Sequence, residues 1–240
     1  MSALIATPPQ HPSPERRATN SLPSALLLAF TGGVLDAFLY IAHGEVFAGA
    51  MTGNAVLTGI ALLSHDRQNA LHHLLPIVSF LVGIWLAFAV ESRMKRHAAV
   101  AGLLFEGLGL FVLSWLPGGY PDALFIVSIS GLAGYQIASF RRVDSYSYNA
   151  TFITANLRTV VEASHNALIP AQRRESLRRL RDLGLVVILF IAGVFIGALL
   201  TSRLGNHALW AAVIPLAVVL ALALDRDLRA ARSQQRGSRL

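Results

Sequence analysis

The chain of 240 residues has no cysteine and little charge, and both absences narrow its class. Without cysteine there is no disulfide framework, thiolate metal site or thiol nucleophile. Charged residues make up 14% of the chain, against about 25% in an ordinary soluble domain. Hydrophobic residues make up 54% and are gathered in runs. This composition is typical of an integral membrane protein.

Sequence motifs of enzymes and metal sites are also missing. We find no GxSxG, Walker A, GxGxxG, HExxH or kinase motif, so we expect neither an enzyme nor a cofactor. His65, His72 and His73 are irregularly spaced, so no metal is expected. The net charge of +7 does not indicate nucleic-acid binding, because Lys and Arg lie almost entirely between or beyond the apolar runs, where they record membrane orientation.

Six runs are long and apolar enough to cross a hydrocarbon layer of about 30 Å as helices. They are residues 25–42, 74–90, 98–116, 123–140, 183–202 and 208–224. Two further segments, 46–63 and 147–168, carry polar residues and could either span the membrane or re-enter it. The fold class expected is an all-α membrane helix bundle, with six spans and two polar re-entrant or half-helix segments; the alternative is eight spans in a parallel 4+4 repeat.

The distribution of Lys and Arg distinguishes these topologies. Six spans place 18 of these residues on the inner side and 2 on the outer side, whereas eight spans give 13 and 6 with Arg158 inside the membrane. The positive-inside bias therefore favours six spans with both termini cytoplasmic. We expect residues 1–24 to be a disordered cytoplasmic tail, 25–224 the membrane domain and 225–240 a basic cytoplasmic tail.

An internal repeat supports the same topology. "FLVGIWLAFAVESRMKRHA" at 80–98 matches "FIAGVFIGALLTSRLGNHA" at 190–208, and "MTGN" at 51–54 matches "ITAN" at 153–156. The halves are about 25–116 and 123–224. An odd number of spans in each half forces the halves into opposite orientations, as in many transporters.

The first half also carries a family resemblance. "TGGVLDAFLYIAHGEVFAGAMTGNAVLTGIAL", with Gly32, Gly33 and Asp36 in its first helix, and the later "GLAGYQIASF" resemble the YoaK family of bacterial membrane proteins. The resemblance covers most of residues 25–224 and implies a multi-pass protein of the bacterial inner membrane. It departs at 153–156, where the family pattern would have "TGT" or "TGN". It implies no substrate, because the family has no settled activity.

Two carboxylates fall inside predicted spans. Asp36 follows Gly32-Gly33, which would permit a kink, and we expect it to face a cavity and titrate, or else to bond a neighbouring helix. Gln136 is its expected repeat partner. Glu106 lies beside Gly107 and Gly109, which would permit close helix approach.

The "MTGN" stretch predicts a half-helix. About nine apolar residues follow it, enough to cross half of the hydrocarbon. Thr52 or Asn54 would cap the helix N-terminus, and Gly53 would allow a close approach or a positive φ. Thr154 and Asn156 would complete one polar locus from the other side of the membrane. The alternative is one continuous tilted helix over 46–63.

These expectations together favour a transporter or channel for a small solute. The candidate binding residues are Asp36, Thr52, Gly53, Asn54, Glu106, Gln136, Thr154 and Asn156. The expected partners are the lipid bilayer, a small polar or anionic solute and a coupling proton. A non-transporting membrane scaffold and an intramembrane enzyme are the alternatives.

Overall fold

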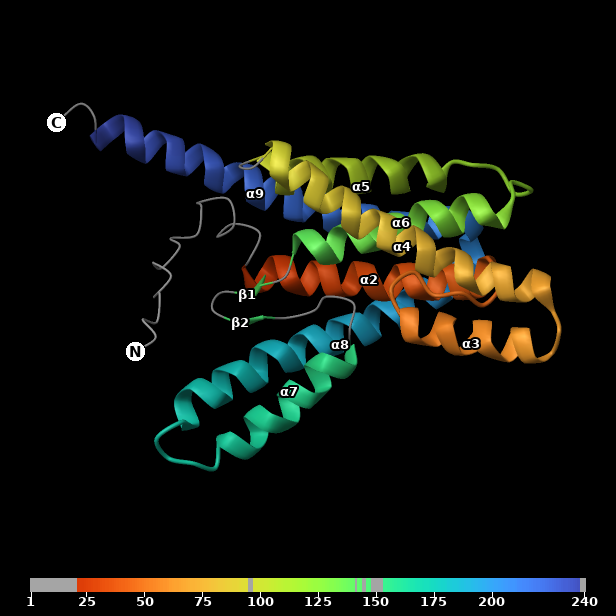
Figure 1. The fold of residues 1–240 in the computed structure, drawn as a ribbon. Helices are drawn as coiled ribbons and strands as arrows, with labels where there is room; N and C mark the ends of the chain where they lie inside the picture. Colours follow the sequence, from red (N-terminus) through yellow and green to blue (C-terminus); the bar gives the residue numbers. More distant parts are fainter. Residues whose placement is uncertain (1–20, 95–96, 141, 144–145, 148–152, 238–240) are drawn as a thin grey trace, which may run out of the picture.

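A computed structural model describes residues 21–94, 97–140, 142–143, 146–147 and 153–237. These residues form a helical bundle, with one antiparallel pairing of two-residue strands (Figure 1). The elements in chain order are α2 (Leu22–Ala42), α3 (Met51–Leu63), α4 (Arg67–Met94), α5 (Ala98–Ser114), α6 (Asp122–Ser139), β1 (Arg142–Val143), β2 (Tyr146–Ser147), α7 (Ile153–Asn166), α8 (Arg173–Leu204), the 3-10 turn η2 (Gly205–Leu209) and α9 (Trp210–Gly237).

Four helical stretches of the described chain are long and apolar enough to cross a bilayer. They are Leu22–Ala42, Arg67–Met94, Asp122–Ser139 and Arg173–Asp225. The last stretch contains both α8 and α9, which run in opposite directions on either side of η2 (Figure 1). Gly205 allows this reversal because its φ of 56° is one that side chains rarely adopt. Helix α5 is apolar and shorter, with 17 residues.

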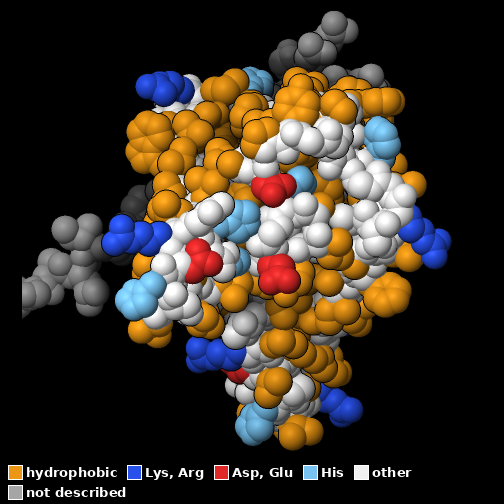
Figure 2. Space-filling model, turned by 90° about the vertical axis from the view of Figure 1, so that its right-hand side faces the viewer, with side chains coloured by type: hydrophobic (Ala, Val, Ile, Leu, Met, Phe, Trp, Pro, Cys, Tyr) orange, Lys and Arg blue, Asp and Glu red, His pale blue; other side chains and the backbone are white. Residues whose placement is uncertain are grey.

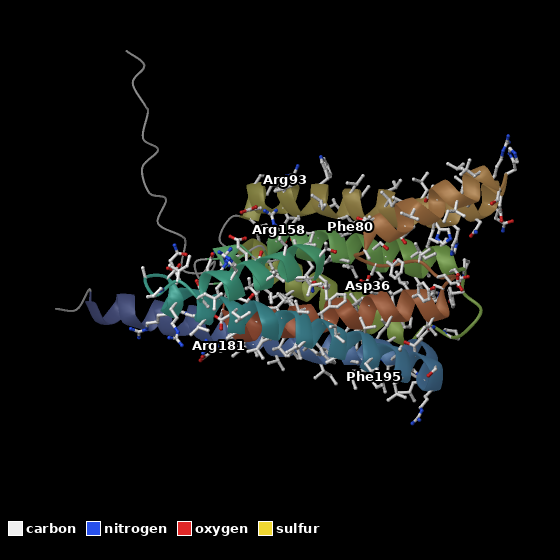
Figure 3. All side chains as sticks on the ribbon, turned by 90° about the horizontal axis from the view of Figure 1, so that it is seen from below. Asp36, Phe80, Arg93, Arg158, Arg181 and Phe195 are labelled. Carbon is white, nitrogen blue, oxygen red and sulfur yellow. The ribbon has the colours of Figure 1, made fainter. Side chains whose placement is uncertain are left out.

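The outer surface of the bundle is apolar, as lipid requires. Trp85 is 67% exposed and Phe195 is 73% exposed, and Figure 3 shows Phe195 directed away from the bundle. Exposed apolar area on this scale marks a surface that contacts lipid or a partner. Together with the helix lengths, it makes the chain a multi-pass membrane protein.

The two segments of uncertain topology form short helices. Helix α3 has 13 residues and α7 has 14, so each rises only about 20 Å, less than a bilayer crossing. From the middle of the molecule they run outward in opposite directions (Figure 1). Residues 46–63 are therefore not one spanning helix. Both short helices bury the same positions, Asn54 and Ala61 in α3 and Asn156 and Ala163 in α7.

Glycines bring α2 and α8 into backbone contact. A Cβ at Gly33 would overlap the carbonyl oxygen of Phe190, and a Cβ at Gly193 would overlap that of Phe30. Helix α2 continues unbroken through Gly32 and Gly33. Gly33 permits this close packing of α2 on α8.

Helices α4 and α6 make the matching contact. A Cβ at Gly83 would overlap the carbonyl oxygen of Gly131, and a Cβ at Gly134 would overlap that of Phe80. The first long helix of each half thus packs on the third helix of the other half.

Helices α2 and α9 extend past both ends of the predicted membrane domain. Residues 1–20 of the predicted tail lie outside the described residues, and α2 already begins at Leu22. At the other end α9 continues to Gly237, well beyond the predicted membrane boundary at 224.

Candidate functional site

The segment between α2 and α3 folds back into the bundle. It leaves α2 through Gly44 and Glu45, whose φ angles of 81° and 59° reverse the chain. Val46 and Ala48 are then buried in the core. Residues 43–50 are called the re-entrant loop below. Its backbone groups leave water without joining a helix, so they need partners from elsewhere in the bundle.

Asp36 supplies one set of partners. Its Oδ1 accepts a hydrogen bond of 2.7 Å from the backbone N–H of Gly49, and the backbone amides of Ala48 and Ala50 also face the carboxylate. The side chain is buried within the bundle (Figure 3). Asp36 therefore binds the loop to α2. That Asp36 faces a cavity and titrates stays a prediction.

Asn54 supplies the second set. The backbone N–H of Phe47 donates to Asn54 Oδ1, and Asn54 Nδ2 donates to the carbonyl oxygen of Phe47, both at 2.9 Å. The side-chain amide thus pairs with the backbone of Phe47 as a neighbouring strand would. The side chain is 0% exposed, so these two bonds are made away from water.

The predicted capping role is wrong. The N-cap of α3 is Ala50, and no side chain caps it. Thr52 lies in the first turn and is exposed, and Asn54 reaches backward to Phe47. Gly53 does not have a positive φ, but a Cβ there would come within 2.9 Å of the Phe47 ring.

In the second half, α7 repeats this pattern of burial. Asn156 is buried and Thr154 is exposed, as are Asn54 and Thr52 in α3. Most of the segment preceding α7 lies outside the described residues. The convergence of Thr52, Asn54, Thr154 and Asn156 on one locus stays a prediction.

A second polar cluster joins α5 to α6. Gln136 Nε2 donates a hydrogen bond of 2.8 Å to Glu106 Oε1. Glu106 is 1% exposed, and its Oε2 has no hydrogen-bond partner among the described residues. Gly107 borders open space, so its predicted role in close packing is wrong, whereas Gly109 contacts Leu132.

Asp36 and Gln136 belong to different clusters. Helices α2 and α6 run antiparallel (Figure 1). The rings of Phe38 and Phe125 lie beside each other, with 6.2 Å between their centroids. Gln136 therefore lies about two and a half helical turns from the level of Asp36. The matched contacts of Gly33 and Gly134 place Ile137, not Gln136, at the position equivalent to Asp36.

The contacts of His43 and His72 at the start of the re-entrant loop were not predicted from the sequence. His43 Nδ1 lies 2.8 Å from Asp122 Oδ1, and its ring stacks on Phe125 at 4.2 Å. His72 Nε2 lies 3.2 and 3.0 Å from the carbonyl oxygens of His43 and Gly44. The sequence offered no periodic signal for the contact between His43 and Asp122, which are 79 residues apart.

The end of the molecule on the right of Figure 1 combines polar and apolar surface. Figure 2 shows acidic and histidine side chains near the middle of a face that is otherwise largely hydrophobic. No group of three potential ligands could hold a metal ion within the part of the chain that the structure describes.

Comparison with known proteins places the chain in a family. Residues 24–222 match the family described as protein of unknown function (DUF1275). The chain belongs to this family. It is also 25% identical over 211 residues to the UPF0700 transmembrane protein YoaK of Bacillus subtilis (strain 168), an alignment that covers 85% of this chain and 92% of the relative. No solved structure matches the chain. The resemblance read from the sequence is thereby confirmed.

Proposed function

We propose that this protein is a six-span transporter or channel for a small solute, built from two inverted halves in the bacterial inner membrane. The observation that carries the proposal is the re-entrant loop, which Asp36 and Asn54 bind inside the bundle. Non-helical backbone at membrane depth is tolerated where protein buries it or where it lines a water-filled path. Transporters and channels use such segments at their solute sites.

The reciprocal packing of the halves supports the inverted repeat. The contacts of Gly33 and Gly193 between α2 and α8 have counterparts in those of Gly134 and Gly83 between α6 and α4. Helices α3 and α7 bury equivalent residues, and both are too short to span. In this proposal the six spanning helices are α2, α4, α5, α6, α8 and α9.

Charge supports the orientation. The six-span topology leaves 18 Lys and Arg residues on one side and 2 on the other. Figure 3 shows Arg93, Arg158 and Arg181 in the same half of the molecule. We assign that end, with both termini, to the cytoplasm.

The short helices favour a neutral polar or an anionic solute. A helix N-terminus presents free N–H groups and partial positive charge. Helices α3 and α7 both begin toward the middle of the molecule (Figure 1). In this proposal the exposed Thr52 and Thr154 contact the solute, and Asp36, Gly53, Asn54 and Asn156 support the backbone around it. Glu106 and Gln136 form a separate part of the site.

Solute flux into proteoliposomes tests the proposal. The full chain would be reconstituted, and swelling after an osmotic step would be followed by light scattering for a panel of neutral polar solutes and small anions, with and without a pH gradient. We expect at least one solute to equilibrate faster than in protein-free liposomes. Asn54→Leu should abolish this gain, whereas Gly107→Ala, at a position bordering open space, should retain it. Wild-type traces that coincide with protein-free traces throughout would contradict transport.

One observation favours a second function, that of a non-transporting membrane scaffold. Asp36 is buried and bound to the loop backbone, as a purely structural carboxylate would be. Asp36→Asn distinguishes the two functions. The substitution should change the solute flux of a transporter, whereas a scaffold shows no solute flux with or without it.

A further inference from the structure

Glu106 is a carboxyl group whose surroundings favour its neutral form. It lies on α5 with 1% of its surface exposed, and its Oε1 accepts the amide of Gln136. Its Oε2 is buried and has no hydrogen-bond partner among the described residues. An ionised carboxylate has two acceptor oxygens to satisfy, and leaving one unsatisfied away from water is costly. A carboxylic acid carries its proton on that oxygen and removes the charge.

Among the described residues no ion pair offsets a negative charge on Glu106, and α4 carries its arginines, Arg67 and Arg93, in its first and last turns. Helix α5 packs on α6 and α9, and more weakly on α4 and η2. Between Trp210 and Leu224, α9 carries no charged side chain. Helix α6 presents Gln136 and Tyr135, and neither side chain is a cation. In η2, His207 packs against Trp115, beyond the far end of α5.

The fold itself does not require a polar pair at this place. The matched helix contacts relate Gln136 to Leu35, and the repeat relates Glu106 to Leu216. Both leucines are buried in the hydrophobic core. Because apolar side chains fill the equivalent positions of the other half, packing alone does not explain Glu106 and Gln136.

We propose that Glu106 is a proton-binding site in the membrane interior, with Gln136 as the residue that positions it. The proton resides on Oε2, and Gln136 donates to Oε1, the carbonyl oxygen of the acid. The hydroxyl of Tyr135 lies 3.5 Å from the carbonyl oxygen of Ala98, at the N-terminal end of α5. In the proposed topology this end of α5 faces the cytoplasm. Release of the proton in that direction delivers it to the proposed cytoplasmic side. The use of this proton to drive solute movement rests on the proposed function; the site itself does not.

Infrared spectroscopy of the full chain in lipid tests the site without any transport assay. At pH 7 we expect a carbonyl band of a protonated carboxylic acid, which Glu106→Gln removes and Asp36→Asn retains. In Gln136→Leu the band should shift to higher frequency, because the carbonyl oxygen loses its donor. This second variant keeps the proposal testable if Glu106→Gln does not fold.

Two results would overturn the proposal. One is a wild-type spectrum at pH 7 without a protonated carboxyl band. The other is a band that neither Glu106→Gln nor Gln136→Leu alters. Absence of solute flux alongside the expected spectra would refute the transport proposal and leave the proton site standing.

Discussion

Asp36 and Asn54 come from different helices, yet together they bind the backbone of the loop from Phe47 to Gly49. Each side chain replaces hydrogen bonds that the loop would otherwise make with water. A buried backbone group left without a partner costs about 1–3 kcal/mol. This explains why two polar residues occur in segments that are otherwise apolar.

Removing the Asn54 amide should destabilise the protein measurably. In Asn54→Leu both the N–H and the carbonyl oxygen of Phe47 lose their partner, so we expect the free energy of unfolding to fall by about 2–4 kcal/mol. Reversible denaturation in mixed micelles would measure it. Thr52→Val, two residues away at an exposed position, is the matched control and should change stability by less than about 0.5 kcal/mol. Equal stability of Asn54→Leu and wild type would show that these bonds do not hold the loop.

Between helices, glycines decide which helices meet. Membrane helices associate through close packing. Lipid tails are as apolar as the helices, so the hydrophobic effect does not drive the helices together. Gly33, Gly83, Gly134 and Gly193 each oppose a carbonyl oxygen of the partner helix, whereas Gly107 borders open space. Glycines of similar appearance in the sequence therefore have different roles.

This difference predicts opposite effects of one substitution. Gly33→Ala and Gly134→Ala should each lower stability by about 1–3 kcal/mol, because the added methyl group forces backbones apart. Gly107→Ala should be neutral or stabilising by up to about 1 kcal/mol, since alanine is the better helix former. Thermal unfolding in one detergent would compare all three. If Gly33→Ala were as harmless as Gly107→Ala, the packing assigned to α2 and α8 would be wrong.

The elements were largely predictable from the sequence, and their polar contacts were not. Apolar runs predicted α2, α4, α5, α6, α8 and α9, because helix length and composition are local properties. Polar interruption predicted that 46–63 would contain a short helix, now seen as α3. The bonds between Gln136 and Glu106 and between His43 and Asp122 depend on how distant helices pack, which periodicity does not encode. The capping prediction failed because Asn54 pairs with backbone seven residues upstream.

On the scale of the whole molecule, symmetry accounts for packing and asymmetry points to function. The halves share glycine contacts and the buried asparagines of α3 and α7. They differ at Asp36 and Glu106, whose equivalents are Ile137 and Leu216. In the proposed inverted repeat, a buried Glu106 whose equivalent position holds a leucine suits a protein that binds a proton at a single site.

The inverted arrangement is tested most directly by the side of the membrane on which the C-terminal ends of α3 and α7 lie. The turn after α3 and the turn after α7 fall on opposite sides of the membrane if the halves are inverted, and on the same side in the parallel eight-span alternative. Since the native chain has no cysteine, Gln68→Cys and Leu168→Cys, both at exposed positions, can each be labelled with an impermeant maleimide on intact spheroplasts. We expect labelling of the Cys at 68 in intact spheroplasts, and of the Cys at 168 only after the membrane is opened. Labelling of both, or protection of both, would contradict it.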